Sequence, residues 1–279
     1  MTDEFIQYTR RGVYPSTEGN MFRMWGEFGE YGANQVHPLG ISFHWPDLWQ
    51  EVAPGENERP RIAKLESLAA LAAKVDVPLL WFGEGKINWR SGQGEIEIGE
   101  ITYAGDGTFN ASLEWIDITN LEPKIQDLLG TNLSSKGAYK PKNKTINSFQ
   151  AYTREFLPTA FVIQDFDILT ETKPGEPAAI VEIKRTRSSP SNWTPYANDW
   201  PNYYLQLSLA KGGSIEPLVL NHKKKFVQRE QVGFYHSIER PENPNTDHDQ
   251  EFLNYTKEII PASEALTRLQ SGDFDFDKS

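Results

Sequence analysis

The chain of 279 residues contains no cysteine. That absence excludes disulfides, thiolate metal sites and cysteine nucleophiles together. Apolar runs are also short, and the longest, residues 68–73, is far below the length that spans a bilayer. The first residues carry neither the basic flank nor the apolar core of a secretion signal. We therefore expect a cytoplasmic or nucleoid-associated protein that does not enter a membrane.

Several common catalytic motifs are missing as well. The sequence has no Gly-x-Ser-x-Gly elbow and no Gly-x₄-Gly-Lys-Ser/Thr loop. Its five histidines are scattered, without the spacing of zinc ligands. These absences argue against a serine hydrolase of the elbow type, a P-loop nucleotidase and a zinc enzyme.

Charged residues are numerous, and they are unevenly distributed along the chain, whose net charge is −11. Residues 136–229 hold 14 Lys and Arg against 8 Asp and Glu, a net of +6, whereas the flanking stretches are acidic. A basic centre of this kind indicates an anionic ligand, or else a chance cluster of solvated lysines. Lys140, Lys142 and Lys144 crowd into the polar stretch 130–145, which is typical of a linker or a phosphate-contacting loop.

Hydrophobic periodicity places the remaining elements and predicts the α/β class. Residues 1–58, rich in glycine and aromatics, are expected to form short strands and long loops. Proline at the start and helical spacing of apolar residues predict a helix over 60–75. Alternation about a glycine-rich turn predicts a hairpin of residues 93–101 and 108–116. Other expected elements are strands at 77–82, 215–220 and 232–238, helices at 199–211 and 263–269, and a polar loop between 238 and 263.

Chemistry is concentrated in a second predicted hairpin, whose two apolar strand-like runs, residues 160–169 and 178–184, flank a turn at residues 173–177. Charged residues interrupt both runs: Asp165 and Asp167 share one face of the first, and Glu182 and Lys184 share one face of the second. Folding about residues 174–175 sets Asp167 opposite Glu182, and Asp165 opposite Lys184.

Three carboxylates gathered on one patch repel each other strongly unless a cation sits among them. Magnesium fits best, because it prefers oxygen ligands, uses few protein carboxylates and keeps several waters. A plain cross-strand ion pair on a solvated sheet face is the alternative, worth roughly 0–1 kcal/mol. The apolar character of both strands and the excess of carboxylates over amines favour the metal site.

Asp167 followed fifteen residues later by Glu182-Ile183-Lys184 resembles the PD-(D/E)XK nuclease superfamily. The resemblance covers residues 148–221, including the helix and strand expected after the triplet. It implies a restriction-endonuclease-like core, with a mixed central β-sheet flanked by helices, and here an N-terminal α+β extension. We accordingly divide the chain into residues 1–135, for recognition, dimerisation or docking, and residues 136–279, the nuclease core.

The resemblance also implies the chemistry of the site. Asp167, Glu182 and the backbone carbonyl of Ile183 would bind Mg²⁺, with Mn²⁺ able to substitute and Asp165 as an alternative ligand. Lys184 would position the attacking water and stabilise charge on the scissile phosphate. The predicted activity is therefore metal-dependent hydrolysis of DNA phosphodiester bonds, in restriction, recombination, transposition or repair.

Further residues are assigned on the same basis. Gln206 resembles the glutamine of a RecB-like motif, and it is a candidate catalytic residue. Trp193 and Trp200 follow the triplet and either stack on a base or anchor their loop. The residues expected to neutralise DNA phosphates are Arg185, Arg187, Lys223, Lys224, Lys225, Lys140, Lys142 and Lys144.

Two other functions remain open at this stage. One is a catalytically inactive nuclease-fold subunit that binds DNA or serves assembly, and the other is a protein-interaction domain whose aromatic N-terminal part docks a partner. Beyond DNA, the partners to be considered are a second copy of the chain and a protein of a recombination or transposition machine.

Overall fold

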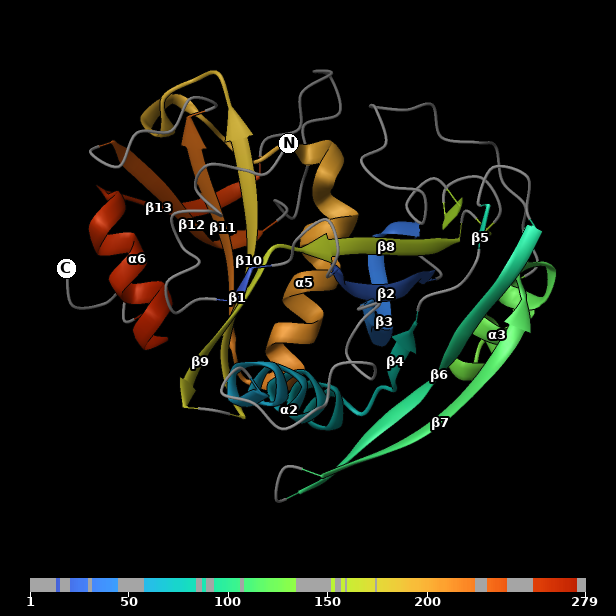
Figure 1. Cartoon of the computed structure of the whole chain (residues 1–279). Helices are drawn as coiled ribbons and strands as arrows, with labels where there is room; N and C mark the ends of the chain where they lie inside the picture. The colour runs from blue at the N-terminus through green and yellow to red at the C-terminus, as the bar shows by residue number, and fades with distance from the viewer. Residues whose placement is uncertain are drawn as a thin grey trace.

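A computed structural model describes thirteen stretches of the chain: residues 14–15, 21–29, 32–44, 58–83, 87–88, 93–105, 108–133, 152–153, 157–158, 160–173, 175–223, 230–239 and 253–274. These residues form a mixed α/β structure with two sheets (Figure 1). The α/β class expected from the sequence is confirmed.

The first sheet has six strands in the order β1-β9-β10-β11-β12-β13. Strands β10 and β11 are parallel, and the remaining neighbours are antiparallel. Its strands are β1 (Tyr14–Pro15), β9 (Ile168–Lys173), β10 (Glu176–Thr186), β11 (Glu216–Lys223), β12 (Gln231–Glu239) and β13 (Asn254–Pro261).

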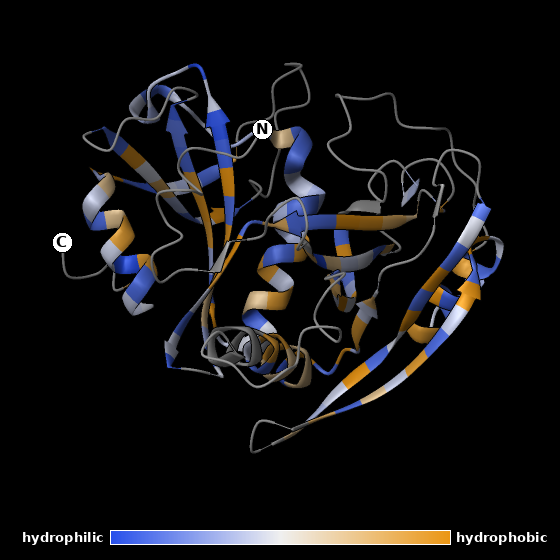
Figure 2. Ribbon diagram, in the orientation of Figure 1, coloured by the Kyte–Doolittle hydropathy of each residue, from blue (hydrophilic) through white to orange (hydrophobic). Residues whose placement is uncertain are grey.

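The second sheet has seven strands, in the order β5-β6-β4-β3-β2-β8 with β7 paired to β6. Polar and apolar residues alternate along the long β6–β7 hairpin, as its sequence predicts (Figure 2). The strands are β2 (Met21–Gly29), β3 (Gly32–His44), β4 (Leu79–Phe82), β5 (Ile87–Asn88), β6 (Gln93–Gly105), β7 (Thr108–Asp117) and β8 (Phe161–Phe166).

Helices fill the space between the sheets and cover their outer faces (Figure 1). Helices α2 (Glu58–Val75) and α5 (Trp200–Gly213) lie between the two sheets. Helix α6 (Ala262–Ser271) covers the outer face of the six-stranded sheet, and α3 (Leu121–Leu128) covers that of the seven-stranded sheet. The helices and strands expected after residue 198 are thus confirmed, with α5 connecting the parallel pair β10 and β11.

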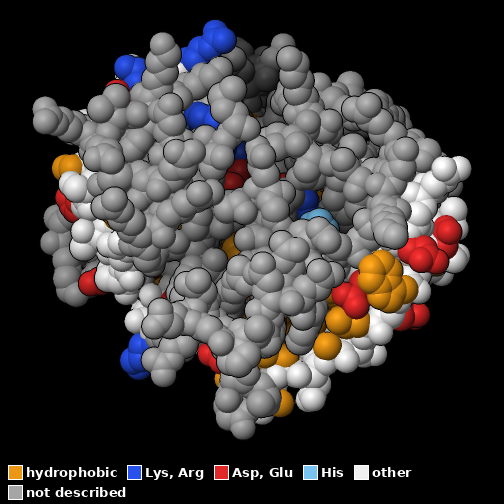
Figure 3. Space-filling model, in the orientation of Figure 1, with side chains coloured by type: hydrophobic (Ala, Val, Ile, Leu, Met, Phe, Trp, Pro, Cys, Tyr) orange, Lys and Arg blue, Asp and Glu red, His pale blue; other side chains and the backbone are white. Residues whose placement is uncertain are grey.

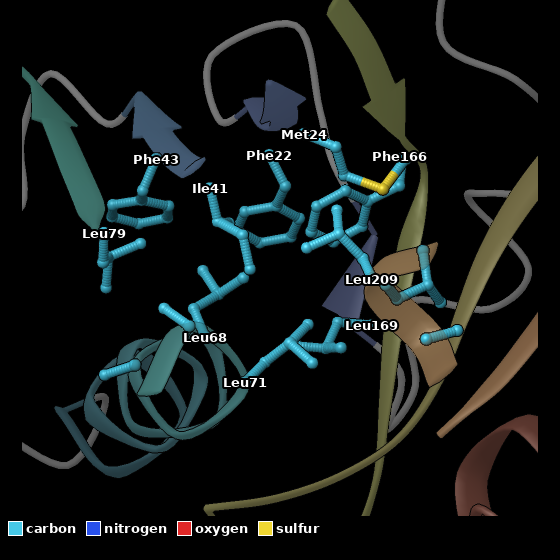
Figure 4. Packing of buried hydrophobic residues seen from close by; sticks show 14 of the residues in the cluster. Phe22, Met24, Ile41, Phe43, Leu68, Leu71, Leu79, Phe166, Leu169 and Leu209 are labelled. Atoms are coloured by element: carbon cyan, nitrogen blue, oxygen red, sulfur yellow. The ribbon is translucent and has the colours of Figure 1, made fainter. Parts of the chain in front are cut away.

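The core between the sheets joins residues that are far apart in the sequence. Phe22 and Phe43, from the seven-stranded sheet, stack at 5.6 Å between ring centroids. They meet Leu68 of α2 and Leu209 of α5, and all four side chains are essentially inaccessible to solvent (Figure 4). Because both helices bury their apolar faces here, the core fixes α5 against the strands that carry the predicted site.

Two expectations about strands are corrected by the structure. The described part of the N-terminal region forms the long strands β2 and β3 where short strands were expected, because each is paired on both sides within the seven-stranded sheet. The rest of residues 1–57, apart from β1, lies outside the described residues, so the expected long loops stay a prediction. The polar loop expected between 238 and 263 contains the edge strand β13, where Ile260 is buried against the core of the six-stranded sheet.

The predicted division between residues 135 and 136 falls in a stretch outside the described residues. The described parts on its two sides share both sheets: β1 pairs with β9, and β2 pairs with β8. Strand pairing in both sheets therefore joins the described residues on the two sides of this division. None of the helices in the described ranges has the length and apolar character needed to cross a bilayer.

Candidate active site

The chain passes from one sheet to the other at Asp167. The sequence predicts one continuous strand over 160–169, but the structure breaks it into β8, which pairs with β2, and β9, which pairs with β10. At the break, the Asp167 backbone N–H donates to the carbonyl of Val181 (3.0 Å). The backbone N–H of Ile183 then donates to Oδ2 of Asp167 at 2.7 Å. A carboxylate oxygen of Asp167 thus accepts the hydrogen bond that a backbone carbonyl would accept if the β9–β10 pairing continued. This bond fixes the Asp167 side chain beside β10.

The predicted register of this hairpin is confirmed from Ala179 to Val181, whereas irregular pairing around Pro177 shifts it close to the turn. Ile168 stands opposite Val181, and continuing the register by one residue sets Asp167 opposite Glu182. Lys184 lies on the same face of β10 as Glu182, with 3.1 Å between Nζ and the nearest carboxylate oxygen. The structure therefore brings the aspartate, the glutamate and the lysine of the predicted triad together.

Asp165 does not face Lys184, and that part of the prediction is wrong. Because β8 has already left the six-stranded sheet, Asp165 stands opposite Arg23 of β2. The two side chains form an ion pair at 2.8 Å, with the Arg23 side chain only 1% exposed. Asp165 nevertheless lies close enough to Asp167 and Glu182 for its charge to raise the pKa of both.

Lys184 has a second acidic partner that the sequence pattern does not reveal. Its ammonium donates to Oδ2 of Asp199 at 3.2 Å, from the turn that precedes α5. Nζ also lies 5.8 Å from the ring centroid of Tyr203, on the first turns of α5. Two carboxylates and an aromatic face therefore hold the ammonium in place.

The loop between β10 and α5 is anchored by aromatic residues. Trp193 and Trp200 are buried in a cluster with Tyr235, so they anchor the loop and do not present free faces for stacking on a base. The hydroxyl of Tyr235 lies 3.0 Å from the carbonyl of Trp193. This anchoring sets the position of Asp199 relative to Lys184.

The carboxylates open into one cavity of about 490 Å³. Figure 3 shows charged side chains recessed in the middle of this face of the molecule. Among the described residues, the polar part of the lining is Arg23, Thr153, Gln164, Asp165, Asp167, Glu182, Asn198 and Asn202. The apolar part is Phe28, Leu157, Pro158, Phe161, Val162, Ile163, Ile183 and Pro201.

Burial and mutual repulsion shape the electrostatics of this cavity. Burial raises the pKa of Asp167 well above its usual value, and the facing charge of Glu182 raises it further. Burial also raises the pKa of Glu182, although the ammonium of Lys184 opposes that shift. For Lys184 itself, burial opposes the charged form, but the carboxylates around it outweigh burial and raise its pKa. The lysine is therefore protonated at neutral pH.

The donor set for a metal consists of two side chains and the backbone. Within the described stretches, no group of three or more His, Asp or Glu side chains has the arrangement of a metal site. The predicted ligands are two carboxylates and the carbonyl of Ile183, a smaller set of the kind Mg²⁺ completes with water. Two buried carboxylates with raised pKa values fit a cation, because each gains from a positive charge between them.

Gln206 belongs to the scaffold rather than to the cavity. Its side chain is 3% exposed. Its amide nitrogen donates to the carbonyl of Ile180 at 2.8 Å and to the carbonyl of Leu218 at 3.1 Å. It does not line the cavity, as far as the described residues show. The amide thus ties α5 to the parallel strands β10 and β11.

The predicted phosphate-contacting residues are placed only in part. Arg185, Arg187 and Lys223 are exposed. Arg185 and Lys223 lie at the shared carboxyl end of β10 and β11, where Thr186 pairs with Lys223. Lys223 shares the sheet face of Lys184, whereas Arg185 points to the opposite face. Lys140, Lys142, Lys144, Lys224 and Lys225 lie outside the described residues.

No protein-family model, curated protein or solved structure matches this chain. The assignment of the site therefore depends on its own chemistry and on the resemblance of its motif.

Two further residues with perturbed pKa values, Arg23 and His44, lie outside the motif. Arg23 reaches the site through the pairing of β2 with β8, and no local pattern marks a partner so distant in the sequence. His44, at the end of β3, is a second example: burial lowers its pKa to about 4, and the charge of Arg23 contributes to the shift. His44 is therefore neutral at physiological pH.

Proposed function

We propose that this chain is a divalent-metal-dependent DNA endonuclease that hydrolyses phosphodiester bonds. The convergence of Asp167 and Glu182 in one cavity, both with raised pKa values, carries the proposal. Carboxylates buried close together are costly in isolation, and strongly perturbed groups in a cleft are typical of functional sites. A cation between them removes the repulsion.

The order of elements around these residues supports the nuclease assignment. The hairpin of β9 and β10 is followed by α5 and then by β11, which returns parallel to β10. A helix and a strand in that order after the Glu-x-Lys strand is what the resemblance to the PD-(D/E)XK superfamily implies. The aspartate stands immediately before β9, and the glutamate and lysine stand towards the end of β10.

In this proposal Asp167, Glu182 and the carbonyl of Ile183 hold Mg²⁺ or Mn²⁺. The bound ion supplies Lewis-acid polarisation of a phosphate oxygen and lowers the pKa of water. The N–H of Ile183 keeps the Asp167 carboxylate oriented, since it donates to Oδ2. The second oxygen of that carboxylate is left for the ion.

Lys184 acts as a donor and not as a base. Its raised pKa keeps the ammonium charged, so it has no lone pair to accept a proton from water. With Glu182 engaged by an ion, Asp199 would still hold the Lys184 ammonium, because Nζ donates to its Oδ2. From this position the N–H groups of Lys184 orient the nucleophile and stabilise charge that develops on the scissile phosphate.

The exposed cations at the carboxyl end of β10 and β11 serve DNA affinity. Arg185 and Arg187 directly follow the motif in the chain, and Lys223 pairs with Thr186 of the same strand, so all three place positive charge at the surface beside the motif. Phosphate contacts by Lys and Arg give affinity that depends on salt and not on sequence. DNA retention by this chain is therefore expected to fall steeply as salt rises.

Plasmid cleavage tests the proposal. Supercoiled DNA is incubated with the protein and Mg²⁺ or Mn²⁺, and nicked and linear products are quantified, with EDTA as the blank. Glu182→Gln and Lys184→Ala are expected to lower the rate by about 100-fold or more, as loss of one transition-state donor does. Matched controls are Glu258→Gln and Lys124→Ala, which remove similarly buried charges from ion pairs that are not part of the cavity.

Two results would contradict the proposal. Variants at Glu182 and Lys184 that cut as fast as the parent would show that the nuclease site lies elsewhere. A parent protein that retains DNA in a salt-sensitive manner but cuts nothing with either metal would be a nuclease-fold DNA-binding subunit. Circular dichroism of each variant separates loss of chemistry from loss of folding.

A further inference from the structure

A third carboxylate, that of Asp165, lines the cavity beside the proposed metal ligands. Asp165 lies two residues before Asp167, about 7 Å along an extended chain. Asp165, Asp167 and Glu182 all line the cavity, and the charge of Asp165 raises the pKa of the other two. An ion held between Asp167 and Glu182 would therefore have a third anionic oxygen donor close by.

Arg23 holds this third carboxylate on the seven-stranded sheet. The pairing of β2 with β8 sets Arg23 directly opposite Asp165, and Nε of the guanidinium lies 2.8 Å from Oδ1 of the carboxylate. The Arg23 side chain is only 1% exposed. Burial lowers the pKa of Arg23, but the charge of Asp165 opposes that shift. Because an arginine keeps its charge in proteins, a guanidinium buried this deeply requires an anion beside it.

The lysine of the site is engaged elsewhere. Lys184 is paired with Glu182 and with Asp199. Among the described residues that line the cavity, Arg23 alone is a lysine or an arginine. We propose that Arg23 is a positioning residue that withholds Asp165 from the metal ion, so that the ion is bound by two carboxylates and not by three. The inference rests on the metal-dependent function proposed above, and it adds to the site a residue of β2 that lies outside the motif.

The number of carboxylates determines what a bound ion can do. Two carboxylates balance the charge of a divalent ion, whereas a third would leave an excess of negative charge around it. Each further anionic ligand binds the ion more tightly, but it reduces the positive charge available to polarise a phosphate oxygen. A third carboxylate would also take a coordination position that water or the substrate needs. The pair of Arg23 and Asp165 therefore keeps the ion reactive and leaves its substrate positions open.

Binding of Mn²⁺ in the absence of DNA, measured by isothermal titration calorimetry, tests this inference. The variants are Arg23→Gln, Asp165→Asn and the two combined. Arg23→Gln should bind Mn²⁺ at least about tenfold more tightly than the parent, an effect of the size expected for a residue that orients metal ligands. The gain should depend on Asp165. Asp165→Asn should therefore weaken binding at least about tenfold more in the Arg23→Gln background than in the parent.

The coupling between the two substitutions separates ligation from an effect of charge at a distance. If Arg23 acted only through its charge, Asp165→Asn would weaken Mn²⁺ binding equally in both backgrounds, and that result would overturn the inference. Arg268→Gln is the matched control, because Arg268 is also paired with a partly buried carboxylate, that of Glu258, but lies outside the described lining of the cavity. This control should leave Mn²⁺ binding unchanged.

A crystal structure of the parent with Mn²⁺ is a second readout, and it does not depend on whether the buried Arg23 tolerates substitution. Asp165 should stay paired with Arg23 while the ion is bound at Asp167 and Glu182. An Asp165 oxygen among the ligands of the ion would overturn the inference.

The outcomes separate the two proposals. Equal effects of Asp165→Asn in both backgrounds, in a parent that cuts DNA, would overturn the inference and leave the nuclease function intact. Coupled effects in a parent that binds Mn²⁺ but cuts no DNA would support the inference and contradict the nuclease function. A parent that binds no Mn²⁺ would contradict both.

Discussion

Asp167→Asn is the substitution that most sharply tests the electrostatics of the site. Asparagine has nearly the same shape, and its Oδ1 can still accept the N–H of Ile183. The change removes one negative charge from two carboxylates that stand opposite each other. Because the pKa of each is raised by burial and by neighbouring charge, the metal-free protein carries this repulsion as a cost.

The size of the effect follows from the geometry of facing residues on adjacent strands. Directly opposite residues have Cβ atoms about 5.5 Å apart, and two charges at about that separation, with an effective dielectric constant near 20, repel by about 3 kcal/mol. Partial exposure of the site screens this to about 2 kcal/mol. In a domain of this size, that is a rise of roughly 4–8 °C in melting temperature for Asp167→Asn in EDTA at neutral pH. Differential scanning calorimetry measures it directly.

The pH dependence has a definite sign. A carboxyl whose pKa is raised by folding binds more protons in the folded state, so stability falls as pH rises from the ordinary pKa near 4 through the raised value. The parent should lose stability over that window, and Asp167→Asn should lose less. The two melting temperatures should therefore converge at acidic pH and separate as pH rises towards neutrality.

A divalent metal ion should reverse the order of the two melting temperatures, so that the parent becomes more stable than Asp167→Asn. A divalent ion at 100 times its dissociation constant stabilises the parent by about 2.7 kcal/mol, and the variant should gain much less. Glu258→Gln is the contrasting control, since Glu258 is paired with Arg268 at 2.9 Å and its loss should lower the melting temperature with or without metal. The reasoning is refuted if Asp167→Asn is less stable than the parent in EDTA at neutral pH.

Two further substitutions separate scaffold from chemistry. Gln206→Leu leaves the carbonyls of Ile180 and Leu218 without their buried donor and should cost about 2 kcal/mol in urea unfolding. Cleavage per folded molecule should not change. A variant that folds but does not cut DNA would instead support the predicted catalytic role of Gln206. Asp199→Asn removes the second carboxylate that holds Lys184 and should lower kcat by about tenfold, while KM stays near that of the parent. It should also move the alkaline limb of the pH–rate profile to lower pH, because the pKa of Lys184 falls. An unchanged profile would show that Asp199 has no part in positioning the ammonium.

The local part of the site is predictable from the sequence because local rules fix it. A turn at 173–177 between two apolar β-rich runs sets the register, and period-2 geometry then places Asp167 opposite Glu182. Helix α5 and strand β11 follow from periodicity in the same way. These features depend on residues that are near neighbours in the chain.

The features of the site that the sequence does not reveal depend on contacts between residues that are far apart in the chain. Nothing within 160–169 indicates that the strand changes sheets at Asp167, because the partner of β8 is β2, more than a hundred residues earlier. The same pairing brings Asp165 into an ion pair with Arg23 and keeps it from facing Lys184. Asp199 reaches Lys184 only because its loop is anchored by the aromatic cluster around Tyr235. These contacts are set by tertiary packing, which local patterns do not encode.

The most direct test of the central claim is the position of a bound metal ion. A crystal of the protein soaked in Mn²⁺ gives an anomalous difference map that locates the ion without reference to activity. The account predicts a peak bound by the carboxylates of Asp167 and Glu182 and by the carbonyl of Ile183. A map with its peaks elsewhere, and none between these two carboxylates, would contradict it.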